Sequence, residues 1–242
     1  MSFLRKLYYQ LFNNRQVVIK EPALLNGYIW IIDEKYGRAY FKGYYEPELT
    51  KYIAENLPED GCFLDIGAHA GYFSLLASVV AKKGSVLSFE PDNQNFSFIK
   101  KIKALNNISY WNIINAAVGK ESGELRFKTG ASSSTGFVDA DGDVVVKQVA
   151  IDTLVKEYNI NRIDLIKIDV EGFGANVIRG GLEALLKFKP QILFECHRGS
   201  DEFAVAWELL SSTFDFFDFS SMQKIEANTG KQIDFVLLKA KA

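Results

Sequence analysis

Carboxylates and a histidine gather at the ends of two apolar runs in the second half of the chain. Residues 164–172 form an apolar run that ends in Asp169 and Glu171, and these two side chains point to the same side if the segment is extended. A later run ends in Glu195 and His197. Such groups could accept a proton from a substrate, or supply oxygen and nitrogen ligands to Mg²⁺ or Mn²⁺.

A strand, a glycine turn and a helix start follow one another at residues 63–72. Gly67 allows the backbone to approach a ligand closely, Gly71 allows the helix to begin tightly against the strand, and Asp65 places a carboxylate at the strand end. The spacing D-x-G-x-x-x-G differs from the dinucleotide fingerprint, and a carboxylate beside the turn suits a cationic ligand better than a pyrophosphate. His69, in the same turn, has either a structural or a functional role.

The ends of the next two apolar runs carry residues suited to a nucleoside. Glu90 lies about 20 residues after the glycine turn, where an acidic side chain can accept hydrogen bonds from ribose hydroxyls. Pro91 and Asp92 then open a helix, so Asp92 either faces the ligand or only caps the helix. Asn115 and Ala116 end the third run, where small residues either leave room for a flat base or allow tight strand packing.

Short apolar runs alternate with helical stretches from residue 58 onward, which is typical of βαβ units on a parallel sheet. We predict core strands at 62–66, 85–89, 111–115, 163–168 and 191–196. Helices are predicted at 72–81, 93–105, 173–187 and 202–212. The fold class is therefore α/β, a Rossmann-like, doubly wound, mostly parallel sheet that carries its ligands at the carboxyl ends of the strands.

Three regions lie outside this alternation. Residues 1–57 are expected to form a helix, a small β-ribbon and a further helix packed on the main domain of residues 58–242; the ribbon strands are predicted at 17–19, 28–32 and 38–41. Residues 121–150 are expected to insert a β-hairpin at the sheet edge around a polar loop at 129–143, which is either a flexible connection or a lid facing the substrate. The last two runs, 214–219 and 233–238, should form an antiparallel hairpin at one sheet edge.

The composition excludes several classes of protein. The 242 residues carry 28 Lys and Arg against 30 Asp and Glu, a net charge of −2, so nucleic acid is not an expected partner. The apolar runs are far shorter than the roughly 20 residues that a membrane span needs. The two cysteines, Cys62 and Cys196, match no disulfide framework. We therefore expect a reduced, cytoplasmic protein.

The first residues form one apolar face at helical spacing, with Phe3, Leu4, Leu7, Tyr8, Leu11 and Phe12. A terminal helix docked on the domain explains this face. Contact with a second copy in a homodimer, or peripheral membrane contact through residues 1–12, are the alternatives.

Three blocks of the sequence resemble the FkbM-type S-adenosylmethionine-dependent methyltransferases. The blocks are residues 63–73, residues 88–92, and a long block that joins 151–154, 164–172 and the pair Gly180-Gly181. The most specific part is D-x-I-K-I-D-V-E-G followed by R-G-G. His69 is a departure, because relatives similar to this chain usually carry Asn there.

The resemblance implies an S-adenosylmethionine site over the first three core strand ends, with S-adenosylhomocysteine (SAH) as product. The first turn would line the methionine part of the cofactor, Glu90 would bind the ribose hydroxyls, and the ends of the second and third strands would border the adenine. The cofactor-binding positions are then Asp65, Gly67, Ala68, His69, Gly71, Glu90, Pro91, Asp92, Asn115 and Ala116. Asp169 and Glu171 would face the methyl acceptor.

Family members are mostly associated with O-methylation, so a hydroxyl of a sugar, glycan or natural product is the expected acceptor. His197 or Asp169 would take the proton of that hydroxyl, with Glu195 or Glu171 orienting the imidazole ring. A divalent metal at the same carboxylates is an alternative that we do not favour. Two other function classes stay open: a nicotinamide-dependent oxidoreductase and a non-catalytic nucleoside-binding domain.

Overall fold

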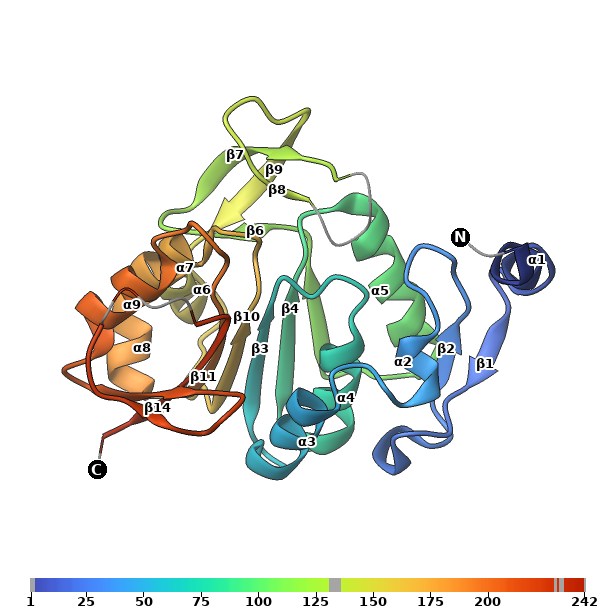
Figure 1. Ribbon diagram of the computed structural model, residues 1–242, viewed down its shortest axis with the longest axis horizontal. Coiled ribbons are helices and arrows are strands. Elements are labelled where there is room, and N and C mark those ends of the chain that lie inside the picture. The colour runs from blue at the N-terminus through green and yellow to red at the C-terminus, as the bar shows by residue number, and fades with distance from the viewer. Residues whose placement is uncertain (1–2, 131–135, 229, 231–232, 242) are drawn as a thin grey trace.

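The chain is built around a central eight-stranded sheet. The computed structural model describes residues 3–130, 136–228, 230 and 233–241. The strands of the central sheet are β3 (Cys62–Ile66), β4 (Ser85–Phe89), β5 (Trp111–Ile114), β10 (Leu165–Ile168), β11 (Gln191–Glu195), β12 (Phe214–Asp218), β13 (Lys224–Ile225) and β14 (Phe235–Ala240). Their order across the sheet is β13-β12-β14-β11-β10-β3-β4-β5 (Figure 1).

The five strands from β11 to β5 run parallel, which confirms the predicted fold class. The bounds of β3 and β4 match the prediction, whereas β5, β10 and β11 are one or two residues shorter. In the register of the sheet, Asp65 on β3 lies opposite Lys167 on β10 and Ser88 on β4. Chemically active side chains therefore meet at the carboxyl end of the parallel strands.

Two layers of helices cover the two faces of this sheet. Alternate strand residues point to opposite faces, so Phe63 joins one buried cluster and Leu64 the other. Helices α4 (Tyr72–Val80) and α5 (Asn93–Leu105) cover the first face. The second face packs against α6 (Ile151–Glu157), α7 (Gly174–Gly180), α8 (Leu182–Phe188) and α9 (Glu202–Leu210).

The prediction of one helix at 173–187 is wrong, because the chain breaks into α7 and α8 at Gly181. A Cβ added to Gly180 would lie 2.0 Å from the carbonyl oxygen of Gly119, so this helix end packs directly on another backbone. Two consecutive glycines also weaken a helix by conformational entropy. This end of α7 therefore packs against the backbone that directly follows residues 117–118.

The N-terminal region packs on the first face of the sheet (Figure 1). Its elements are α1 (Phe3–Phe12), β1 (Gln16–Val18), the 3₁₀ turn η1 (Ala23–Leu25), β2 (Ile29–Ile31), α2 (Ala39–Lys42) and α3 (Pro47–Asn56). Strands β1 and β2 pair antiparallel. The side chain of Asn106, at the end of α5, accepts a hydrogen bond from the Ile29 amide at 2.7 Å and donates one to the Ile29 carbonyl at 2.9 Å, which ties the ribbon to α5.

The strand predicted at 38–41 is wrong, since this segment is the short helix α2. Tyr40 and Phe41 are both buried, although they are adjacent in sequence. Successive side chains of a strand point to opposite sides, whereas one helical turn can direct both toward the core. Gly43, at a φ of 78°, ends the turn in the left-handed region.

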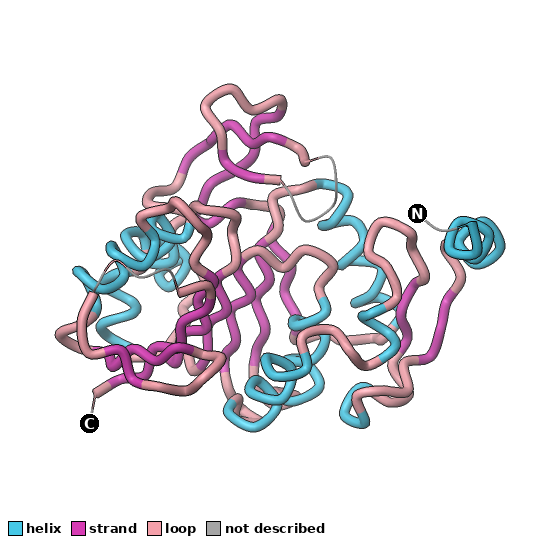
Figure 2. The backbone as a smooth tube through the Cα atoms, in the orientation of Figure 1, coloured by secondary structure: helices cyan, strands magenta, loops and turns pink. Residues whose placement is uncertain are grey.

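The segment after β5 forms a sheet of its own instead of extending the central sheet. It contains β6 (Ala117–Val118), β7 (Gly123–Lys128), β8 (Phe137–Val138) and β9 (Val144–Val149), in the order β6-β9-β7-β8. The antiparallel pairing of β7 with β9 agrees with the predicted hairpin. Figure 2 shows this inserted sheet above the central one. Part of the predicted lid loop, residues 131–135, lies outside the described residues.

The two ends of the chain lie at opposite sides of the molecule (Figure 1). At the C-terminal side, β14 pairs antiparallel with both β11 and β12, so the predicted edge hairpin is present, and β13 adds a short strand that the sequence did not indicate.

At the N-terminal side, α1 exposes Leu7, Leu11 and Phe12. The side chains of Phe3 and Leu4 lie outside the described residues, and contact of α1 with a membrane or a second copy stays a prediction. Within the described part of the chain, no helix is both long and apolar enough to span a bilayer.

Candidate active site

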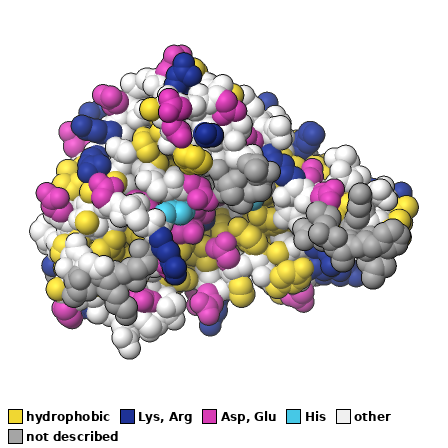
Figure 3. Space-filling view, turned by 45° about the horizontal axis from the view of Figure 1, so that its top comes forward, with side chains coloured by type: hydrophobic (Ala, Val, Ile, Leu, Met, Phe, Trp, Pro, Cys, Tyr) yellow, Lys and Arg dark blue, Asp and Glu magenta, His cyan; other side chains and the backbone are white. Residues whose placement is uncertain are grey.

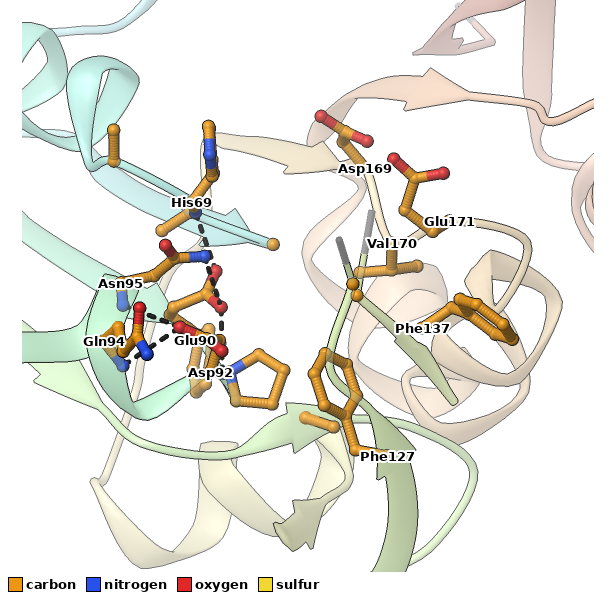
Figure 4. A pocket seen from close by; sticks show the side chains of 18 of the residues that line it. His69, Glu90, Asp92, Gln94, Asn95, Phe127, Phe137, Asp169, Val170 and Glu171 are labelled. Carbon is orange, nitrogen blue, oxygen red and sulfur yellow. Dashed lines mark hydrogen bonds between the residues drawn. The ribbon is translucent and has the colours of Figure 1, made fainter. Parts of the chain in front are cut away.

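A cavity of about 680 Å³ lies between the carboxyl ends of the parallel strands and the inserted sheet. Its size is within the usual range of small-molecule sites, roughly 300–1,000 Å³. In Figure 4, His69 and Glu90 lie on one side of this cavity and Asp169 and Glu171 on the other, with Phe127 below. The cavity therefore collects residues from β3, β4, β10 and the insertion.

The glycine turn forms the floor of the cavity where β3 ends. The amides of Gly67 and Ala68 both donate to the carbonyl oxygen of Phe89, at 3.1 and 3.0 Å. Gly67 has a φ of +80°, and a Cβ there would lie 1.8 Å from the carbonyl oxygen of Asp169. Only glycine allows the turns after β3 and β10 to approach so closely. Gly71, the other glycine of the motif, precedes α4 and is not among the described residues that line the cavity.

Glu90 is 5% exposed and lines the cavity directly after β4. Its carboxylate accepts hydrogen bonds from the His69 amide at 2.7 Å, the Asp92 amide at 3.0 Å and the Asn95 side chain at 3.3 Å. Burial raises the pKa of Glu90 to about 7, and these hydrogen bonds limit the rise. The acid is thus fixed in position and titrates near neutrality.

The residues after β4 and β5 shape the cavity beside Glu90. Asp92 lines the cavity and also caps α5, because its carboxylate accepts hydrogen bonds from the amides of Gln94 and Asn95. Pro91 and Ala116 also line the cavity. Asn115 is not among the described lining residues; its side-chain amide donates to the carbonyl oxygens of Glu90 and Pro91 at 2.9 and 3.2 Å and so holds the turn after β4.

Asp65 lies beneath the cavity and is fully buried. Its Oδ2 accepts a hydrogen bond from the Ser74 hydroxyl, whereas Oδ1 has no hydrogen-bond partner among the described residues. The ammonium group of Lys167 lies 4.0 Å from Oδ1 and 3.0 Å from Asp169 Oδ2. Burial alone would lower the pKa of Lys167, but Asp169 and Asp65 raise it above its ordinary value. Lys167, which lines the cavity, is therefore a buried cation held by two carboxylates.

His69 is held by tyrosines from the N-terminal region, which the sequence did not indicate as site residues. The Tyr40 hydroxyl lies 3.1 Å from His69 Nδ1, and the Tyr36 ring meets the imidazole edge-on. Among the described residues, no hydrogen-bond partner faces His69 Nε2. Burial lowers the pKa of His69 to about 4, so the imidazole is neutral at physiological pH.

His197 lies among four carboxylates at the other side of the site. Its Nε2 is 3.5 Å from Glu171, 3.9 Å from Glu195 and 4.0 Å from Asp169, and its Nδ1 is 3.2 Å from Glu202. Figure 3 shows acidic and histidine side chains side by side at a hollow in this face. The structure thus brings together all three predicted catalytic residues.

The carboxylates control the protonation of this cluster. The hydrogen bond to Glu202 is the main cause that raises the pKa of His197 to about 9, against the effect of burial. Burial would raise the pKa of Asp169, but Lys167 and His197 lower it below its ordinary value. Burial and Asp169 raise the pKa of Glu195 to about 7. Free of ligand, the cluster holds a protonated imidazole and an ionised Asp169 at neutral pH.

Glu202 is a site residue that sequence reasoning missed. Sequence reasoning placed Glu195 or Glu171 as the group that orients His197, yet Glu202 makes the hydrogen bond. The only signal was an acid five residues after the histidine, which becomes informative once the turn between them is known.

The cluster fits a divalent cation poorly. Ligand atoms of Asp169, Glu195 and His197 lie within 4.8 Å of one another. However, the Lys167 ammonium group already pairs with Asp169, and the raised pKa of His197 favours imidazolium, which has no lone pair for a metal. The Asp169 oxygen and the His197 nitrogen that a metal would need are therefore already occupied, by the Lys167 ammonium group and by a proton.

Comparisons with known proteins identify relatives of this chain. Residues 65–226 match the Methyltransferase FkbM domain. The chain is 25% identical over 160 residues to the hexuronic acid methyltransferase AglP of Haloferax volcanii, a match that covers 64% of each protein. It is 24% identical over 186 residues to Methyltransferase 1 of Beauveria bassiana, covering 66% of this chain and 74% of that one.

Solved structures share the fold at low sequence identity. The methyltransferase FkbM from Methylobacillus flagellatus KT superposes with a TM-score of 0.52 at 16% identity, covering 78% of this chain and 50% of that one. A Streptococcus mutans protein crystallised in complex with SAH superposes with a TM-score of 0.50 at 12% identity, covering 81% and 97%.

Proposed function

Because the chain belongs to the FkbM methyltransferase family, we propose that it transfers a methyl group from S-adenosylmethionine to a hydroxyl of a sugar, glycan or natural product. When bound, S-adenosylmethionine supplies a methyl group already activated on a sulfonium cation. The chain must hold the cofactor, align the acceptor oxygen and receive the hydroxyl proton.

The position of Glu90 is the observation that carries the proposal. A carboxylate offers about four lone-pair sites, and Glu90 uses three for protein donors. At least one site is left for a ribose hydroxyl in the cavity. The Streptococcus mutans protein of similar fold was crystallised with SAH, which supports SAH as a ligand of this fold.

The turn after β3 is proposed to hold the methionine part of the cofactor. Gly67, Ala68 and His69 line the cavity there. His69 Nε2 is buried and has no hydrogen-bond partner among the described residues, and a neutral imidazole does not repel a sulfonium cation. Asp65 contributes indirectly, because it is buried beneath the floor and helps to hold Lys167.

His197 is proposed as the group that receives the proton of the acceptor. Asp169 is the weaker base of the two, since its pKa is lowered by its pairing with Lys167. Glu171 lines the cavity and lies 3.5 Å from His197 Nε2, whereas His197 is not among the described lining residues. The acceptor would therefore meet the imidazole at the edge of the cavity, beside Glu171. The reaction needs His197 unprotonated at the moment when the acceptor oxygen forms its new bond.

The charge at this side of the cavity favours a neutral acceptor. Asp169, Glu171 and Glu195 surround one imidazole, so the carboxylate of a uronic acid would be repelled. The Haloferax volcanii relative is a hexuronic acid methyltransferase, which supports a sugar as the acceptor in general.

A matched pair of acceptors tests this function. The protein is incubated with S-adenosylmethionine and either a methyl glycoside of a neutral hexose or the corresponding glycoside of its uronic acid, and methylated product is detected by mass spectrometry. We expect product from the neutral sugar. Preferred transfer to the uronic acid would contradict the neutral acceptor, and absence of methyl transfer to a broad panel of hydroxyl compounds would contradict O-methylation.

A further inference from the structure

The carboxylate of Glu202 is completely enclosed, yet it stays charged. Glu202 is 0% exposed and begins α9. Oε1 accepts from the Gly174 amide at 2.8 Å, and Oε2 accepts from the Ser200 hydroxyl at 2.8 Å. Oε2 also accepts from the His197 amide at 2.7 Å and lies 3.2 Å from His197 Nδ1. Burial alone would raise the pKa of Glu202, but these donors lower it below its ordinary value.

The loop between β11 and α9 is shaped to bring this carboxylate to His197. Gly199 has a φ of +80°, and the Ser200 amide donates to the carbonyl oxygen of His197 at 3.2 Å, so the chain turns back on itself. Gly174, at the start of α7, leaves the space: a Cβ there would lie 2.4 Å from the Phe194 ring and 2.8 Å from Glu202 Oε1. The backbone of α7 thus supplies a donor where a side chain would not fit.

The hydrogen bond to Glu202 decides which nitrogen of His197 faces the acceptor. With Nδ1 donating to Glu202, Nε2 is the nitrogen that faces Glu171, Glu195 and Asp169. In the neutral imidazole only one nitrogen carries a proton. A proton held on Nδ1 by Glu202 leaves the Nε2 lone pair for the acceptor hydroxyl.

We propose that Glu202 is a positioning residue for methyl transfer, whose buried carboxylate holds the His197 ring in the Nδ1–H tautomer with Nε2 directed at the acceptor. This role rests on the proposed function, because there His197 receives the proton. The charged groups around His197 are the carboxylates of Asp169 and Glu171 after β10, Glu195 at the end of β11 and Glu202 on α9, with the Lys167 ammonium group behind Asp169.

Nuclear magnetic resonance of the ligand-free wild-type protein tests the tautomer without any substitution. The chain has two histidines, so a His69→Asn variant assigns the two sets of imidazole ¹⁵N signals. We expect His197 to titrate with a pKa of about 9 and to show the Nδ1–H tautomer above that pH. A neutral His197 in the Nε2–H form would overturn the proposal.

The variant Glu202→Gln removes the charge and keeps the shape, and Glu208→Gln on the same helix is the control, because Glu208 is exposed. In Glu202→Gln we expect the pKa of His197 to fall by at least about one unit toward its ordinary 6.5. In a plot of kcat/KM against pH, the pH below which kcat/KM declines should fall by the same amount. If Glu202→Gln does not fold, the tautomer of His197 in the wild-type protein still decides the proposal.

If Glu202→Gln is slower but keeps the wild-type pH dependence of kcat/KM and the wild-type pKa of His197, Glu202 has only a structural role. Titration with SAH separates this outcome from failure of the proposed function. Wild type and Glu202→Gln should bind SAH within about twofold of each other, since Glu202 lies outside the cofactor cavity. If neither binds SAH, the proposed function fails, whatever the tautomer of His197.

Discussion

The backbone amide of His69 donates a 2.7 Å hydrogen bond to the carboxylate of Glu90, which joins the turn after β3 to the end of β4. The bond fixes an acid with a pKa near neutrality against the wall of the cavity. The same turn carries the neutral imidazole of His69. Two properties of the proposed cofactor site, its affinity and its pH dependence, therefore depend on Glu90.

The affinity for SAH should fall in weakly acidic solution. The pKa of Glu90 is raised to about 7, so its carboxylate becomes protonated as the pH drops below neutrality and loses the charge that strengthens its bond to a ribose hydroxyl. If only the ionised form binds well, affinity at about pH 6 is up to about tenfold weaker than at about pH 8. Calorimetric titration across this range checks it, with Glu90→Gln as the pH-independent control. A constant wild-type affinity would show that Glu90 does not bind the nucleoside.

The pH dependence of kcat/KM should distinguish the two candidate bases. The pKa of His197 is raised to about 9, so the unprotonated form that can accept a proton becomes more abundant as the pH rises. We expect kcat/KM to rise about tenfold per pH unit below that value and then to level off. The His197→Gln variant should lose most of its turnover and should no longer show the rise of kcat/KM with pH, while still binding SAH. A profile that is flat from weakly acidic pH upward would point to Asp169, whose pKa is lowered.

Replacing Lys167 should destabilise the fold strongly. Lys167 is 3% exposed, and Lys167→Met would leave Asp169 and Asp65 without their buried counter-charge. Removing one partner of such a pair typically costs about 3–5 kcal/mol. The control is Lys156→Met, which breaks an exposed 3.7 Å pair with Glu183 and should cost about 0–1 kcal/mol. Urea unfolding measures both variants, and equal losses would contradict the buried pairing.

Methyl transfer should not need a divalent cation. Lys167 already pairs with Asp169, and the imidazolium of His197 has no lone pair for a metal. We therefore expect initial rates to persist after exhaustive treatment with a chelator. A rate that disappears and returns with Mg²⁺ would mean that Asp169, Glu195 and His197 form a metal site after all.

The parts of the fold that could be predicted are those in which local pattern and burial agree. The bounds of β3, β4 and α5 match the predictions, since apolar runs end at turn residues and Asp92 caps the helix. The helix α2 was predicted as a strand, because a short apolar segment has no clear period and its conformation depends on where Tyr40 and Phe41 pack.

The same division holds for the candidate site. Glu90, His197 and Asp169 end apolar strands, so their approach to a common edge could be predicted from the parallel sheet alone. Glu202 and Tyr40 could not, because each reaches a histidine through a turn or a packed segment whose course depends on tertiary contacts. Asp65 has the predicted position at a strand end, but the sequence does not reveal that Ser74 and Lys167 enclose it.

Calorimetric titration with SAH tests the central claim most directly, with NAD titrated in parallel. Wild type and the exposed-site control Glu121→Ala should bind SAH with micromolar affinity and should not bind NAD. Glu90→Ala removes charge-assisted hydrogen bonds worth about 1.5–3 kcal/mol, so it should weaken SAH binding by about 10- to 150-fold. Absence of SAH binding to the wild type, or tighter binding of NAD, would contradict the proposed methyltransferase site.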